Sequence, residues 1–316
     1  MHTNHPDKTI DELCGLFGKS RQAYYQQGRH IYKASVKEEV VLKLVSEKRE
    51  CMPNIGGKKL YREIQKRLGQ ELRIGRDAFF DLLRSNGLLI KKKRYRVKTT
   101  MSKHRFRMYP NLIKNLTPNG PHQIWVSDIT YIETQEGFAY LFLITDAFSR
   151  KIIGWQVSET MEADNAVKAL YMALSQLPAG MKGTIHHSDR GVQYCCDKYT
   201  KVLLKNDIQI SMTENSDPLE NAIAERVNGI LKTEWLYHVK IETKQEAKNR
   251  IEKIIRIYNT KRPHSSIDMM TPEKAHTTSG ELKRHWKNRW KERYEIANQE
   301  TYNLKEGSVL NKVITK

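Results

Sequence analysis

The chain has 316 residues and a formal net charge of +19, which allows two or three domains and favours nucleic acid over a membrane surface as its partner. It has no apolar run near the roughly 18 residues of a spanning helix and no basic-then-apolar leader. Its four cysteines match neither a disulfide framework nor a zinc spacing, so we expect a cytoplasmic protein with free thiols and no membrane contact.

The first 90 residues carry short helical patterns. Residues 9–27 predict two short helices separated by a Gly-Lys-Ser break, and residues 36–50 predict a charged helix with one apolar face. Residues 54–69 and 75–89 predict two further helices, each with apolar positions three and four apart and a terminating glycine. Together these elements predict a helix-turn-helix DNA-binding region over residues 1–90.

A basic segment follows the helices. Residues 91–107 contain nine Lys and Arg, two aromatic residues and no acid. One interpretation is a solvated linker; the other is a linker, over residues 91–120, that also contacts the DNA backbone and makes binding fall with salt. The second interpretation assigns DNA contacts to Lys91, Lys92, Lys93 and Arg94.

From about residue 122 the pattern changes to alternating strands and helices. Strands are expected over residues 123–134, 138–150, 151–159, 183–191 and 209–214. Helices are expected over residues 161–177, 197–208, 217–236 and 243–264. Asp217 is the expected N-cap of the third of these helices, with Pro218 in its first turn. This order predicts an α/β fold, a mixed five-stranded sheet flanked by helices over residues 121–277, followed by a basic tail over 278–316.

Three carboxylates stand out in this α/β region. Asp128 lies in the middle of the first strand, on the face opposite Trp125 and Tyr131, where an acid is costly unless something pairs with it. Asp189 ends the fourth strand, where ligands meet a sheet edge, and Glu225 lies two turns into the third helix. If the first and fourth strands are neighbours, the helix brings Glu225 over both aspartates. Three such carboxylates make a hard-oxygen site for Mg²⁺, and two ions there support phosphodiester chemistry.

The same helix carries other polar residues on one face. Asn221 and Asn228 lie four before and three after Glu225, so they share its face. Lys232 lies two turns beyond Glu225, where it could hold a DNA phosphate or base near the metal ions. We assign DNA contacts to these three residues.

Each acid also has an ordinary interpretation. An aspartate at a strand end is usually a turn or cap residue, and a glutamate inside a helix is usually solvated. Asp146 could compete as a ligand, but we interpret it as a hydrogen-bond partner near the end of the second strand. Of His186 and His187, one faces each side of the strand, and we expect at least one to be packed. Capping or helix-dipole roles suffice for Glu214, Asp217 and Glu220.

Four motifs, "WVSDITYI", "HSDRGVQY", "LENAIAERVNGILKTE" and "YNTKRPHSSIDMMTPEKA", together resemble those of bacterial insertion-sequence transposases. The chain is similar, from about residue 10 to 276, to the catalytic second-frame subunit (often called OrfB) with a retroviral-integrase-type core. The resemblance implies a ribonuclease-H-like fold and a DDE triad of Asp128, Asp189 and Glu225 that binds Mg²⁺, with Mn²⁺ as a substitute. The His-His-Cys-Cys module of retroviral integrases is absent from the sequence, so no structural zinc is expected.

The resemblance also implies a reaction and its partners. The enzyme would cleave the element's terminal inverted repeats and join the freed 3′-hydroxyl to target DNA, without a covalent enzyme intermediate. It would work as a multimer on DNA in the bacterial nucleoid, alone or with a first-frame (OrfA) protein. Two other functions stay open, a DNA-binding regulator with an inactive core and a ribonuclease-H-type nuclease; the leading helices and basic linker argue against the nuclease.

The sequence departs from the family in two places. The residues before the catalytic helix, 216–222, read Ser-Asp-Pro-Leu-Glu-Asn-Ala, and Arg226 stands where a small serine is usual. Neither change removes a predicted metal ligand. At the end of the core, Arg262 and His264 are expected to stabilise packing, and residues 281–295 predict a basic helix that either contacts DNA or a partner or is a solvated tail.

Overall fold

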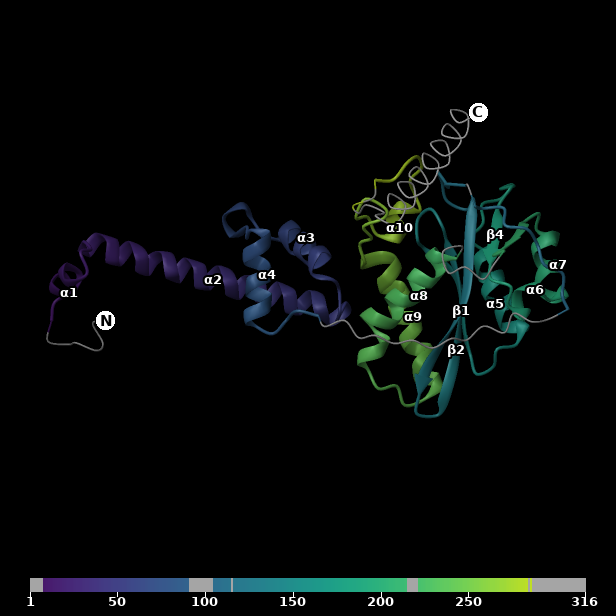
Figure 1. Ribbon diagram of the computed structural model, residues 1–316, viewed down its shortest axis with the longest axis horizontal. Helices are drawn as coiled ribbons and strands as arrows, with labels where there is room; N and C mark the ends of the chain where they lie inside the picture. Colours follow the sequence, from purple (N-terminus) through teal and green to yellow (C-terminus); the bar gives the residue numbers. More distant parts are fainter. Residues whose placement is uncertain (1–7, 91–104, 115, 215–220, 284, 286–316) are drawn as a thin grey trace, which may run out of the picture.

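The computed structural model describes residues 8–90, 105–114, 116–214, 221–283 and 285. Several predicted features lie outside these residues, namely Lys91, Lys92, Lys93, Arg94, the N-cap Asp217 and most of the basic tail. In Figure 1 a helical region extends to one side of an α/β core. No helix within the described ranges is both long and apolar enough to cross a membrane.

The helical region precedes the sheet, as predicted. Its elements are α1 (Ile10–Leu16), α2 (Arg21–Cys51), α3 (Gly57–Arg67), η2 (Gln70–Leu72) and α4 (Arg76–Ser85). The predicted break between residues 27 and 36 is wrong, because α2 is one continuous helix. Ser20 caps its start by accepting a hydrogen bond from Ala23 N at 3.1 Å. No proline interrupts α2, and the internal Gly28 costs only about 1 kcal/mol.

The second half of α2 packs with α3 and α4 around an apolar core. Apolar side chains three and four residues apart on these helices are buried, among them Val41, Val45, Leu60, Ile64 and Phe79. The same apolar cluster continues into the layer between the sheet and helices α8 and α9. The helical region is therefore packed against the α/β core.

The sheet has the predicted mixed topology. Its strands are β1 (Ile124–Thr134), β2 (Gly137–Asp146), β3 (Ile152–Ser158), β4 (Ile185–Ser188) and β5 (Gln209–Met212). Their order is β3-β2-β1-β4-β5, with β1 to β3 antiparallel and β4 and β5 parallel to β1. This arrangement confirms the five-stranded, ribonuclease-H-like sheet.

Helices cover both faces of the sheet (Figure 1). One face carries α5 (Ala163–Leu174), α6 (Val192–Cys195) and α7 (Asp197–Lys205). The other carries α8 (Ala222–Glu234), η3 (Leu236–His238) and α9 (Lys244–Lys261), and the short α10 (Pro272–Ala275) packs against α9. Helix α5 approaches β3 closely at Gly154, where an added Cβ would lie 2.2 Å from Ala169 O.

A buried polar cluster joins the helical region to the core. Arg262 is 0% exposed and donates two hydrogen bonds, at 2.7 and 2.6 Å, to the carboxylate of Glu234 at the end of α8. Lys59 Nζ of α3 lies 3.8 Å from the same carboxylate. Trp235 Nε1 donates to Cys51 O at 2.9 Å. These contacts confirm the packing role expected for Arg262 and fix the helical region at the end of α8.

Candidate metal and DNA site

The register of β1 and β4 places two of the predicted acids side by side. Val126 of β1 is paired with His187 of β4 in the parallel ladder. Asp128 follows Val126 by two residues, and Asp189 follows His187 by two residues. Continued by two residues beyond this last pair, the register would bring Asp128 alongside Asp189, and the charge of Asp189 does raise the pKa of Asp128. Because β4 ends at Ser188, Asp189 stands at the carboxyl end of its strand.

A polar stripe of α8 lies along the same part of β1. Asn221 Nδ2 donates to Ser127 O at 2.9 Å, and Asn228 Nδ2 donates to Asp128 Oδ2 at 2.7 Å. Glu225 lies between the two asparagines on that helix face, because it follows one by four residues and precedes the other by three. The two amide contacts therefore hold α8 so that Glu225 is carried toward Asp128.

The Asp128 carboxyl is influenced by both other acids. Burial is the largest cause that raises its pKa, to about 7, followed by the charge of Asp189 and, more weakly, that of Glu225. Hydrogen bonds from Asn228 and from Ile129 N, the latter at 2.9 Å, lower the pKa and partly offset this shift. Without a cation, Asp128 therefore holds a proton up to near-neutral pH.

Asp189 forms a turn as well as facing Asp128. Its Oδ1 accepts a hydrogen bond from Gly191 N at 3.0 Å, the arrangement of an Asx turn. A Cβ at Gly191 would lie 3.0 Å from that oxygen, so the missing side chain lets the turn close. The ordinary interpretation of Asp189 is thus correct, and it leaves the half-buried carboxylate within the field of Asp128.

The donor set fits a hard divalent cation. Asp128, Asp189 and Glu225 offer only carboxylate oxygens, which Mg²⁺ and Mn²⁺ prefer. The raised pKa of Asp128 reflects burial first and then the negative charges of the other two acids. In the part of the chain that the structure describes, no three His, Cys, Asp or Glu side chains are grouped closely enough to hold a metal ion. The acids share one electrostatic field without forming a closed set of ligands.

Lys232 lies one turn beyond Asn228 on the same stripe of α8. Its Nζ is 4.0 Å from the centre of the Tyr131 ring. Burial lowers the pKa of Lys232 while the charge of Asp128 raises it, so the amine is within electrostatic reach of the acids. Its contact with DNA stays a prediction, as do those of Asn221 and Asn228, whose amides already bind β1.

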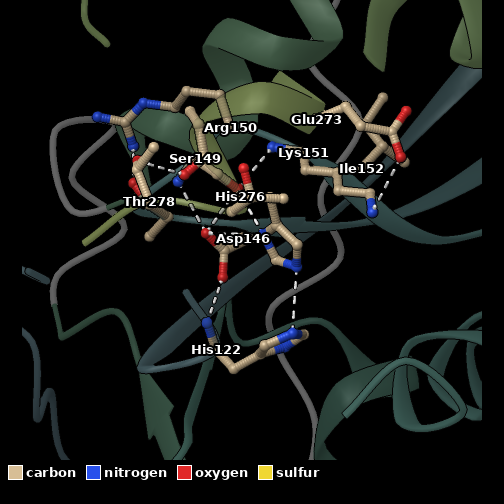
Figure 2. Close-up of polar contacts among 12 residues, drawn as sticks. His122, Asp146, Ser149, Arg150, Lys151, Ile152, Glu273, His276 and Thr278 are labelled. Carbon is tan, nitrogen blue, oxygen red and sulfur yellow. Dashed lines mark hydrogen bonds and ion pairs between the residues drawn. The ribbon is translucent and has the colours of Figure 1, made fainter. Parts of the chain in front are cut away.

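Asp146, the competing acid, is enclosed by hydrogen bonds (Figure 2). Its Oδ2 accepts from His122 N at 2.7 Å, and its Oδ1 accepts from both Ser149 N and Ser149 Oγ at 2.8 Å. Ser149 Oγ also lies 2.9 Å from His276 Nδ1, and Asp146 is 0% exposed. These contacts support the structural interpretation, because Asp146 ties the β2–β3 turn to the segments before β1 and after α10.

Both histidines of β4 are packed, not only one. His186 Nε2 lies 2.6 Å from Ser127 Oγ and 2.9 Å from Tyr199 Oη, and burial lowers its pKa to about 3. His187 Nδ1 lies 2.8 Å from Ser211 Oγ. The two rings support the sheet from opposite faces beneath the acids.

Two residues near the acids escape prediction from sequence. Burial raises the pKa of Tyr194 well above its usual value, and Tyr199, Asp128 and Asp189 add to the shift, so this tyrosine lies close to both aspartates. Its only signal is its place in the "HSDRGVQY" motif. The contact of Tyr131 with Lys232 was not predicted, because strand alternation puts Tyr131 on the sheet face opposite Asp128.

Comparisons with known proteins identify the family to which the chain is similar. Two models of the integrase core domain family match residues 118–218 and 206–272. The chain is 35% identical over 266 residues to the insertion element IS600 uncharacterized 31 kDa protein of Shigella sonnei, covering 82% of this chain and 96% of the relative. It is 36% identical over 194 residues to the transposase for insertion sequence element IS904 of Lactococcus lactis, covering 61% and 76%.

Among solved structures, the HTLV-2 integrase catalytic core domain in complex with magnesium aligns with 51% of this chain and 99% of its own, at 19% identity and a TM-score of 0.41.

Proposed function

Because the chain belongs to the insertion-sequence transposases with an integrase core domain, we propose that Asp128, Asp189 and Glu225 form the divalent-metal site at which it cuts and joins DNA. The observation that carries this proposal is that Asp189 and Glu225 both act electrostatically on the buried Asp128. The β1–β4 ladder runs toward the two aspartates and ends two residues before each of them, at Val126 and His187. After burial, the charges of Asp189 and Glu225 raise the pKa of Asp128.

The carboxylates would hold Mg²⁺, or Mn²⁺ in its place. Bound there, two ions would activate the attacking oxygen and stabilise the departing 3′-oxygen of a phosphodiester. The three carboxylates share an electrostatic field, and a bound cation would offset their mutual repulsion. Binding would require loss of the proton that Asp128 retains up to a pH of about 7.

The chain's other residues orient this site. Asn228 holds one oxygen of Asp128, and Ile129 N holds the other, so the carboxylate cannot rotate away from its partners. Asn221 anchors the start of α8 to Ser127 O and so sets the height of Glu225 above the sheet. The amine of Lys232 supplies a positive charge on the same stripe, suited to the phosphate beside the cut.

The proposed substrates are the element's terminal inverted repeats and target DNA. The net charge of +19 supports a polyanionic substrate, and the helical region packed at the end of α8 would hold DNA close to the acids. Pairing two DNA ends requires more than one copy of the chain, so a multimer on DNA belongs to the proposal. A first-frame partner stays a prediction.

A nicking and strand-transfer assay on the element's own ends tests the proposal. Wild type and Glu225→Gln are compared with Mg²⁺, Mn²⁺ or EDTA, and DNA binding is measured beside cleavage. Glu252→Gln is the matched control, an exposed glutamate of α9 far along the chain. We expect metal-dependent cleavage in wild type and the control, and none in Glu225→Gln although it still binds DNA.

Other outcomes would change the assignment. Cleavage that persists in Glu225→Gln would remove this residue from the metal site. Binding without cleavage in every protein would mean that this chain is a DNA-binding subunit or regulator, or that it needs its first-frame partner.

A further inference from the structure

An open cavity lies at the end of β1, beyond the three acids. It has a volume of about 430 Å³, and the ends of β1 and β2, α8 and the segment after η3 line it. Among the described residues, no strand pairs with β1 beyond Val126 on the side of β4. The cavity therefore opens at a free edge of the central strand, where Lys232 can reach around to the ring of Tyr131.

Three aromatic residues, Tyr131, Phe138 and Tyr237, line this cavity together with two lysines. Tyr131 and Phe138 pack edge to face, with ring centres 5.2 Å apart, and Phe138 is 51% exposed. Lys232 lies over the Tyr131 ring, and the exposed Lys240 lies on the wall beyond. A flat apolar surface beside two cations suits a ligand that carries both a planar ring and a negative charge.

The cavity is also close to the proposed cutting site. Tyr131 follows Asp128 by three residues, which spans about 10 Å along a strand. Lys232 lies between the acids and the cavity. Its amine covers the Tyr131 ring, and the charge of Asp128 raises its pKa against the larger lowering by burial. A DNA strand whose phosphate is held at the acids would reach the cavity within one or a few nucleotides.

We propose that this cavity, built on Tyr131 and Phe138, binds one unpaired nucleotide of the DNA end next to the cut. The inference rests on the proposed function for its substrate. A paired base has no free face, so the end of the duplex must open for the base to stack on Phe138. The phosphate would face Lys232 and Lys240, because Glu133 on the other wall repels it.

Photo-crosslinking tests the inference without cleavage. The full chain is bound, in EDTA, to a terminal-repeat duplex that carries 5-iodouracil at one of the three positions on either side of the cut. This base crosslinks to aromatic rings stacked on it, and mass spectrometry identifies the residue. We expect a crosslink to Phe138 or Tyr131. Crosslinks that map only to other residues, or none in a stable complex, would overturn the inference.

Cleavage of a fully paired end gives the second readout. Phe138→Leu should slow nicking by about tenfold, since one base–aromatic stack is worth about that factor. Tyr171→Leu, which removes a 57% exposed aromatic ring from α5, a helix that contributes no residue to the cavity, should leave the rate unchanged. An equal rate in Phe138→Leu and wild type would also overturn the inference.

The two proposals fail separately. If wild type cleaves but the crosslink maps elsewhere, the metal site stands and the nucleotide cavity falls. If the crosslink maps to the cavity but no protein cleaves, the cavity stands as a nucleic-acid site and this chain by itself does not carry out the proposed reaction.

Discussion

Replacing Arg262 with methionine is expected to destabilise the fold by about 3 kcal/mol. The buried guanidinium of Arg262 donates two hydrogen bonds to Glu234, and methionine would leave that carboxylate as a buried charge without its main partner. Losing one partner of a buried pair costs roughly 3 to 5 kcal/mol. The lower value applies here because Lys59 Nζ, whose pKa burial lowers to about 8, remains 3.8 Å from the carboxylate.

Equilibrium urea unfolding at neutral pH measures this cost. Arg250→Met is the control, since Arg250 pairs with Glu246 at 2.6 Å on an open helix surface, where a pair contributes at most about 0.5 kcal/mol. Adding Glu234→Leu to Arg262→Met should recover much of the loss, because the unpaired charge is then gone. A loss below about 1 kcal/mol, or equal losses in the buried and surface variants, would refute the reasoning.

Three further changes test other parts of the structure. Without divalent metal, the melting temperature should fall as pH rises through about 7. The reason is that the Asp128 carboxyl has a pKa of about 7 in the folded chain and an ordinary pKa of 3.8 in the unfolded chain, so the folded chain holds the proton more tightly. Asp128→Asn should lose this pH dependence, and an unchanged profile in that variant would exclude Asp128 as its source. Gly154→Ala should cost about 3 kcal/mol in urea unfolding, since its Cβ would meet Ala169 O at 2.2 Å; a neutral result would mean that α5 can move away from β3. Gly191→Ala should weaken Mn²⁺ binding in a calorimetric titration while the melting temperature stays near that of wild type, because the new Cβ would press on Asp189 Oδ1 at 3.0 Å; wild-type affinity would show that the turn is dispensable.

Hydrophobic periodicity was enough to predict the sheet. The alternation in residues 123–134 and the apolar run in 138–150 correspond to β1 and β2 within a few residues. The same pattern could not place the end of one helix and the start of the next, because nothing in the side chains between residues 27 and 36 stops α2. Local signals thus identify elements better than they identify where elements end.

The candidate site was predictable only in its chemistry. Strand alternation and helix spacing put Asp128 and Glu225 on definite faces, but the approach of Asp189 to Asp128 depends on pairing between strands far apart in sequence. The bond from Trp235 to Cys51 joins residues 184 positions apart, and the contact of Lys232 with Tyr131 depends on a free strand edge. Such contacts follow from tertiary packing, which no local pattern contains.

Metal binding itself tests the central claim most directly. Mn²⁺ is titrated into the full chain at pH 8 by calorimetry, in wild type, Asp128→Asn, Asp189→Asn and Glu225→Gln, with the exposed α9 variant Glu252→Gln as control. We expect saturable binding in wild type and the control, and a loss of at least about tenfold in affinity in each of the three acid variants. Undiminished affinity in any of them would show that its acid does not bind the metal and would contradict the account.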